Sequence, residues 1–138
     1  MLYTVNEATF ELPDALHDQS VNIFTATPSG ASPFNIVITR STVETGSTLA
    51  DHVTREVDLQ QQTLAGFSPE WRRGYQVDDR PAEITAARID GQVPMEQRQV
   101  YFLAGTRSLT ITASAQDRFQ PAQLAVLNDF LDSFRFRD

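Results

Sequence analysis

Cysteine and lysine are both missing from this chain of 138 residues. Without cysteine there is no thiol nucleophile, no disulfide and no thiolate metal site, and this composition suits a reducing compartment. Without lysine, neither a Schiff base nor the lysine contact of a P-loop can form, because both need an amine. The 11 basic side chains are therefore all arginines. These two absences exclude several large classes of enzyme.

Long apolar runs and an excess of positive charge are lacking as well. No stretch approaches the roughly 18 consecutive apolar residues of a transmembrane helix. The first residues carry no basic and apolar signal segment, so we expect a cytoplasmic protein that does not itself span a membrane. The formal net charge of −7 repels phosphate backbones, which argues against nucleic acid as a partner.

Catalytic and metal-binding patterns are equally scarce. His17 and His52 are the only histidines, and neither has a partner at the spacing of a metal site. The adjacent Asp78 and Asp79 are typical of a hairpin turn, and Ser20 lacks the flanking glycines of a nucleophile elbow. We therefore expect no enzyme, no cofactor and no metal site. A small hydrolase or isomerase is the enzymatic alternative, and the missing catalytic groups argue against it.

Alternating residues and turn signals predict an antiparallel sheet. Two short strands open the chain, and a hairpin follows in which the turn cluster at residues 28–33 joins two further strands. The second half is a predicted meander, with turns at Asp78–Pro81, Asp90-Gly91 and Gly105-Thr106. The predicted strands cover residues 3–5, 8–12, 20–26, 34–40, 71–77, 82–90, 98–104 and 108–115.

Two helices complete the expected secondary structure. The first begins at a cap of Ser47 or Thr48, has an apolar stripe at residues 49, 53, 57 and 64, and ends before Gly66. Its polar side, which includes residues 60–62, is predicted to be solvated. The second begins at Pro121 and carries apolar residues at 124, 127, 131 and 134. With 41% hydrophobic residues, residues 1–138 suffice for a single α+β domain with its own core.

Short segments spread over nearly the whole chain carry a resemblance to a known family. The order Asn-Glu-Ala, Glu-Leu-Pro-Asp and Asp-Gln-Ser-Val-Asn-Ile-Phe at residues 6–24 resembles the opening of the Eag chaperones, the effector-associated proteins of bacterial type VI secretion. The segments at 38–40, 49–51, 64–67 and 98–101 and the closing apolar helix support it. The resemblance implies a fold similar to the DcrB-like and PsbP-like domains. We accordingly expect a curved antiparallel sheet with two helices packed on one face.

The resemblance also implies a function. Eag chaperones are cytoplasmic homodimers that hold the N-terminal transmembrane helices of a PAAR-containing effector and aid its loading onto the spike protein. A helix made for lipid is apolar all round and aggregates in water, so its carrier has to offer a matching apolar surface. The alternative is a DcrB-like binding module that acts on an envelope component, which would need an export signal upstream of this chain.

Similarity to the family assigns six candidate client-binding residues. Val21 and Ile23 lie two apart on one strand face, and Val37 is on the neighbouring strand. Gln99 matches a polar position that contacts the client helix, and Tyr101 lies on the same side of its strand. Glu56 stands in the first helix where related chains have Gln. For Val21, Ile23 and Val37, the alternative to a client-binding cleft is an ordinary hydrophobic core.

Overall fold

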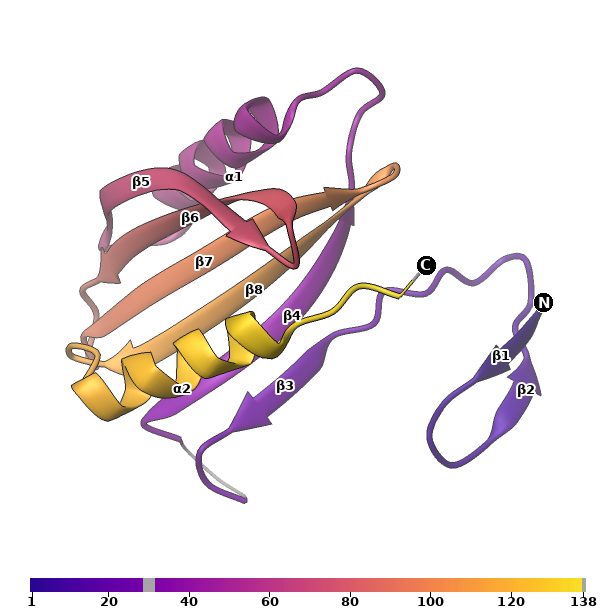
Figure 1. Cartoon of the computed structure of the whole chain (residues 1–138), viewed down its shortest axis with the longest axis horizontal. Helices are drawn as coiled ribbons and strands as arrows, with labels where there is room; N and C mark the ends of the chain where they lie inside the picture. The colour runs from indigo at the N-terminus through magenta and orange to yellow at the C-terminus, as the bar shows by residue number, and fades with distance from the viewer. Residues whose placement is uncertain (29–31, 138) are drawn as a thin grey trace.

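A computed structural model describes residues 1–28 and 32–137. The main sheet has six antiparallel strands in the order β3-β4-β8-β7-β6-β5 (Figure 1). The expected hairpin is formed by β3 and β4, although residues 29–31 of its turn lie outside the described residues. The strands are β3 Asn22–Thr25, β4 Phe34–Thr42, β5 Phe67–Val77, β6 Arg80–Ile89, β7 Met95–Ala104 and β8 Arg107–Gln116.

The predicted turns explain how the meander closes. Between Val77 and Arg80 the hairpin loop has only two residues, and both Asp78 (φ 50°) and Asp79 (φ 61°) adopt the left-handed conformation. Positive φ at both central positions is the pattern of a type I′ turn, whose twist matches that of the flanking strands. The carboxylate of Asp78 also accepts a hydrogen bond of 2.9 Å from the backbone N–H of Phe136. The same turn therefore anchors the C-terminal segment.

Helix α1 (Leu49–Thr63) is the first predicted helix, and Thr48 rather than Ser47 caps it. The Thr48 hydroxyl accepts a hydrogen bond of 3.1 Å from the backbone N–H of Asp51, which satisfies one of the free donors of the first turn. Val53 of the predicted apolar stripe is fully buried and Leu49 and Val57 are half-buried, whereas Leu64 follows the helix end and is 42% exposed. Gly66 (φ 79°) follows the helix end, as expected.

Helix α2 (Pro121–Ser133) lies on the other face of the sheet. Its Leu127 and Leu131 are buried in the main core with Val100 and Phe102 of β7. Burying a leucine side chain contributes about 1.5–3 kcal/mol, so these two contacts fix α2 on the sheet. The core also contains Phe34, Ile36, Ile38, Val77, Ala82, Ile84, Ile111, Ala113 and Ala115.

The α+β class and the open antiparallel sheet are confirmed, but the placement of the helices differs from the expectation. On β7, Val100 and Phe102 pack under α2, whereas the alternate residues Gln99 and Tyr101 bond to Gln60 of α1. Successive residues of a strand face opposite sides, so the helices cover opposite faces rather than one. Strand β7 is therefore covered by α2 on one side and by α1 on the other, and its side chains alternate between the two.

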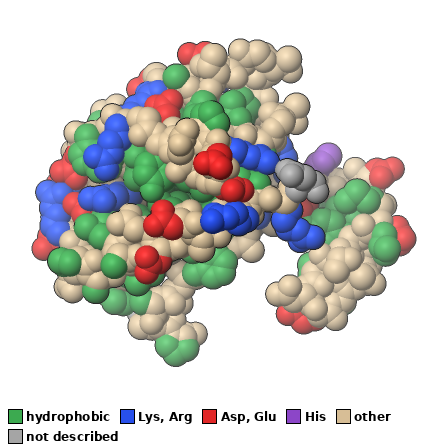
Figure 2. All heavy atoms as spheres, in the orientation of Figure 1, with side chains coloured by type: hydrophobic (Ala, Val, Ile, Leu, Met, Phe, Trp, Pro, Cys, Tyr) green, Lys and Arg blue, Asp and Glu red, His purple; other side chains and the backbone are tan. Residues whose placement is uncertain are grey.

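An N-terminal hairpin, made of β1 (Leu2–Thr4) and β2 (Thr9–Glu11), forms a separate two-stranded sheet. Figures 1 and 2 show it projecting from the body with hydrophobic side chains on its surface. Leu2 is 65% exposed and Phe10 is 43% exposed. Its connection to the body includes a hydrogen bond from the guanidinium of Arg107 to the backbone carbonyl of Asp18. In residues 1–28 and 32–137, no helix is long and apolar enough to cross a membrane.

Candidate client-binding face

Four strands place a row of side chains on the α1 side of the sheet. Register pairs Ile23 of β3 with Val37 of β4, Val37 with Thr112 of β8, and Thr112 with Gln99 of β7. Directly opposed residues of antiparallel strands share a face, so the row is continuous. Helix α1 packs on β5, β6 and β7. The part of this side over β3, β4 and β8 is called the open face below, and it includes Ile23, Val37, Thr39 and Thr112. Val21, which immediately precedes β3, continues the open face by strand alternation.

Apolar side chains on the open face meet solvent. Val21 is 51% exposed and Ile23 is 64% exposed, while Val37 is half-buried. The hydrophobic core lies on the opposite side of the sheet, where Ile36 and Ile38 of the same strand β4 are buried. Val21 and Ile23 are thus not core residues in this chain. Large aliphatic residues adjacent on an exposed sheet face are typical of a surface that another molecule covers.

A network of glutamines forms the edge of the open face beneath α1. Gln60 of α1 donates to Oε1 of Gln99 at 3.0 Å and accepts from Nε2 of Gln97 at 3.0 Å. Gln99 in turn donates to the hydroxyl of Thr112 at 3.1 Å. The network therefore links α1 to β7 and β8, and it brings amide and hydroxyl groups next to the apolar row.

Tyr101 lies beneath α1 rather than on the open face. It is 1% exposed, and its hydroxyl donates to Oε1 of Gln99 at 2.6 Å. Burial raises the pKa of Tyr101 to about 12, so the phenol is neutral and remains a donor at physiological pH. In this conformation Tyr101 positions Gln99 and does not itself present a surface to a partner.

Gln60 and Gln97 take part in the network, but neither was among the candidate residues from the sequence. The sequence predicts residues 60–62 to be exposed to solvent. Gln60 is half-buried, whereas Gln61 and Gln62 are exposed. A signal was available, because Gln60 follows Val53 by seven residues and therefore lies on the same stripe of the helix. Gln97 precedes Gln99 by two residues, so strand alternation places both on the α1 side of β7.

Glu56 occupies a different place from the other candidate residues. It is half-buried on α1 and lines a cavity of about 340 Å³ between α1 and the end of β4, together with His52. His52 is 4% exposed, and its ring packs edge-on against Tyr101 with 6.1 Å between ring centroids. Burial lowers the pKa of His52, although the nearby Glu56 carboxylate acts in the opposite direction.

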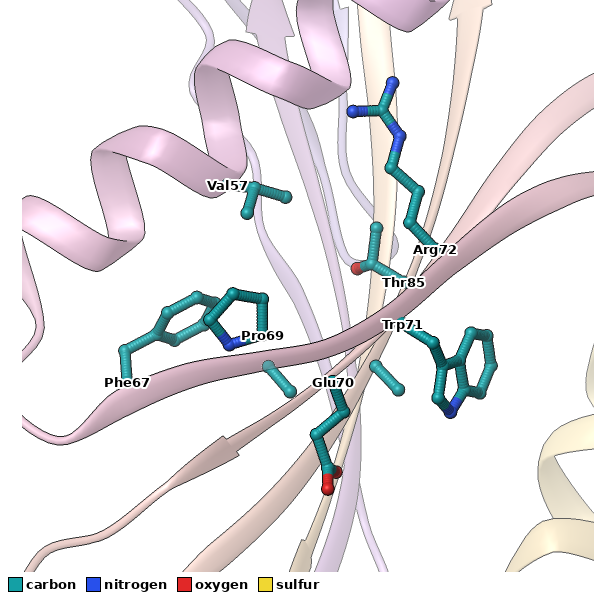
Figure 3. Close-up of a pocket in the computed structure, with 9 residues that line it drawn as sticks. Val57, Phe67, Pro69, Glu70, Trp71, Arg72 and Thr85 are labelled. Atoms are coloured by element: carbon teal, nitrogen blue, oxygen red, sulfur yellow. The ribbon is translucent and has the colours of Figure 1, made fainter.

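A second cavity, of about 240 Å³, lies between the C-terminal half of α1 and the edge strand β5. In Figure 3, Phe67 and Pro69 of β5 lie below Val57 of α1, while Trp71 points to the other side of the strand. The register of β5 against β6 shifts between Pro69 and Trp71, and both residues line the cavity. None of the six candidate residues lines it. Among the described residues, no group of three or more metal-ligating side chains is placed to hold an ion.

Comparison with known proteins agrees with the resemblance found in the sequence. The chain is 40% identical to Effector EagT6 of Pseudomonas aeruginosa strain PAO1 over 67 residues, which are 48% of this chain and 46% of that protein. The match thus spans about half the length of the curated relative.

Solved structures show the same fold. PA94 of Pseudomonas aeruginosa, a protein of unknown function, superposes with a TM-score of 0.77 at 25% identity over 100% of this chain and 97% of its own. The cyanobacterial PsbP of Synechocystis sp. PCC 6803 superposes with a TM-score of 0.50 at 10% identity, over 95% and 86% of the two chains. The second likeness shows the PsbP-like fold alone. Residues 7–133 match the model of the DcrB family, and the chain belongs to that family.

Proposed function

We propose that this protein is a type VI secretion chaperone that binds the N-terminal transmembrane helices of a PAAR-containing effector. In this role it keeps the helices from aggregating in the cytoplasm and aids loading of the effector onto the spike protein. The similarity to Effector EagT6 supports the association with an effector. The observation that carries the proposal is the open face, where exposed Val21 and Ile23 lie beside a strip of hydroxyl and amide groups.

Both parts of this surface suit a transmembrane helix. Burial of apolar side chains against Val21, Ile23 and Val37 removes them from water, at about 25 cal/mol for each Å². Transmembrane helices also carry small and hydroxyl-bearing residues that hydrogen-bond weakly to neighbours, and Gln99 and Thr112 offer matching groups. From β3 to β8 the open face spans two strand spacings, about 10 Å, and Gln99 of β7 lies at its edge. This width is close to the diameter of a helix, about 10–12 Å.

One sheet face covers only one side of a helix, so we propose a homodimer in which a second copy covers the other side. The projecting hairpin of β1 and β2 favours self-association, since an isolated two-stranded sheet is marginally stable in water. Its exposed Leu2 and Phe10 gain from contact with another surface. Light scattering is expected to give twice the chain mass of 15.4 kDa at micromolar concentration. A constant mass of one chain would contradict the dimer.

The binding proposal is tested with a reporter protein that carries an apolar helix of about 20 Leu, Ala and Gly residues. Co-production with this chain is expected to keep the reporter in detergent-free solution and to co-purify it. The double variant Val21→Asp with Ile23→Asp should stay folded but lose the reporter, because charges on the open face oppose apolar contact. Val126 is the matched control, being 53% exposed on α2 on the opposite side of the sheet.

Val126→Asp is expected to retain the reporter. Equal capture by all three proteins would refute the open face as the binding surface. No capture by the wild-type chain would refute helix binding itself, and would favour a DcrB-like module that acts on an envelope component.

A further inference from the structure

The cavity beside α1 combines a carboxylate with apolar walls. Its walls come from the end of β4 with the residues that follow, and from α1. Val43 and Leu59 form the apolar part, and Leu59 is 52% exposed. Its polar lining comprises Glu56, His52 and Arg55 of α1, with Thr42 and Glu44 on the opposite wall. The space of about 340 Å³ is sufficient for one long side chain that is apolar along its stem and polar at its end.

The carboxylate of Glu56 has no ion pair and no side-chain hydrogen bond within the described residues. Arg55, the nearest cation on the helix, is directed to other partners. Its guanidinium lies 3.4 Å from the carboxylate of Glu44 and donates to the hydroxyl of Ser47 at 2.5 Å. The Glu56 carboxylate is therefore half-buried and unpaired within the described residues, which favours contact with an external cation.

His52 adds a second, independent sign that the cavity is incomplete. It is 4% exposed, and its Nε2 atom has no hydrogen-bond partner among the described residues. A buried polar atom without a partner is rare in folded proteins and is costly. Tyr101, which packs against the ring from β7, is neutral, and the lowered pKa of His52 keeps the imidazole neutral at pH 7. Arg72 of β5 also reaches α1, but its guanidinium is paired with Glu83 at 2.6 Å and donates to the hydroxyl of Thr54.

We propose that this cavity binds a lysine or arginine side chain that flanks the apolar helix of the client, with its cationic group on Glu56. This deepens the proposed function and rests on it. Thr42, on the cavity wall, ends the strand whose Val37 and Thr39 form the open face. A helix lying along β4 therefore places one of its ends at the cavity. Transmembrane helices carry Lys and Arg just beyond their apolar segments, so a carrier meets a cation at that position.

The test uses two fluorescently labelled apolar helices that are identical except for one flanking residue, Lys in one and norleucine in the other. A third helix, with Glu at the same position, is used with a charge-reversed variant. Glu56→Gln removes the charge and keeps the shape. Asp58→Asn makes the same charge change on the exposed side of α1 and is the control. Binding is followed by anisotropy at low salt. Glu56→Gln is expected to lower the affinity for the Lys helix about three- to tenfold and to leave the affinity for the norleucine helix unchanged.

Asp58→Asn should bind both helices as the wild type does. The charge-reversed Glu56→Arg should prefer a helix with a Glu flank, which separates an electrostatic contact from a packing effect. Equal affinity of the wild type for the Lys and norleucine helices would overturn the cation site and leave the proposed function intact. If neither helix binds to the wild type, the proposed function fails, and the cation site fails with it.

Discussion

Replacing Gln60 with alanine tests whether the glutamine network holds α1 on the sheet. The variant removes three donor contacts of Gln60 Nε2, to Gln99 at 3.0 Å, to Tyr101 at 3.3 Å and to the backbone of the helix at 3.2 Å. It also removes the acceptor of Gln97, which is 7% exposed. Gln99 retains its bond from the Tyr101 hydroxyl at 2.6 Å, so the main loss falls on Gln97.

A buried donor that loses its acceptor costs about 1–3 kcal/mol. Alanine returns a few tenths of a kcal/mol through its higher helix propensity, so the free energy of unfolding should fall by roughly 1–3 kcal/mol. For a chain of this length that corresponds to a fall in Tm of about 4–12 °C. Urea unfolding followed by circular dichroism measures the first quantity, and a thermal scan the second.

Gln62→Ala is the control, because Gln62 is exposed on the same helix and the chemical change is identical. It should alter the free energy of unfolding by no more than about 0.5 kcal/mol. If Gln60→Ala and Gln62→Ala unfold at the same urea concentration, the network contributes nothing to stability. In that case its amides are free to turn toward a partner without loss.

Local patterns in the sequence were sufficient for most elements of the fold. Ile111 and Ala113 alternate with threonines, and the structure buries these two on the α2 side as alternation requires. Val53 and Leu127 lie on the predicted helix stripes and are both buried. Such predictions succeed because the period of a helix or strand is a property of the backbone and needs no knowledge of what lies across it.

The choice of sheet face for each helix depends on contacts between distant segments, and here the sequence was insufficient. Alternation correctly groups Tyr101 with Gln99, but it does not show that α1 covers the first and reaches only the edge of the second. Similarly, Gln60 has the composition of a solvated position and the helical phase of a buried one. A polar residue can satisfy its amide inside a network, so composition alone misplaces it.

The open face itself lies between these two cases. Ile23 and Val37 share a side by strand alternation, and register places them directly opposite each other. Whether that side is core or surface depends on the helix that covers the other side of β4, where Leu127 and Leu131 of α2 pack in the core. The exposed apolar face over β3 and β4 therefore exists because α2 packs on the opposite side of β4.

Three further measurements address individual residues. The phenol of Tyr101 should ionise near pH 12, well above the pKa of an exposed tyrosine. Because the folded pKa is raised, the contribution of Tyr101 to stability is complete below about pH 10 and is lost as the pH rises through 12. Absorbance near 295 nm follows the ionisation, and urea unfolding at each pH follows the stability. Burial raises the pKa of Glu96, but hydrogen bonds from Arg118 and the backbone of Phe119, together with the charges of Arg118 and Arg98, lower it below its usual value. Glu96→Gln should therefore destabilise at pH 7, and the difference from the wild type should vanish as the pH falls through the lowered pKa. Gly66 and Gly46 both have positive φ. A Cβ atom added at Gly66 would lie 2.0 Å from the backbone oxygen of Asp90, whereas a Cβ atom added at Gly46 would have no atom within 4 Å. Gly66→Ala should therefore cost about 1–3 kcal/mol more than Gly46→Ala in urea unfolding, and equal costs would show that backbone strain alone, without the close approach, sets the effect.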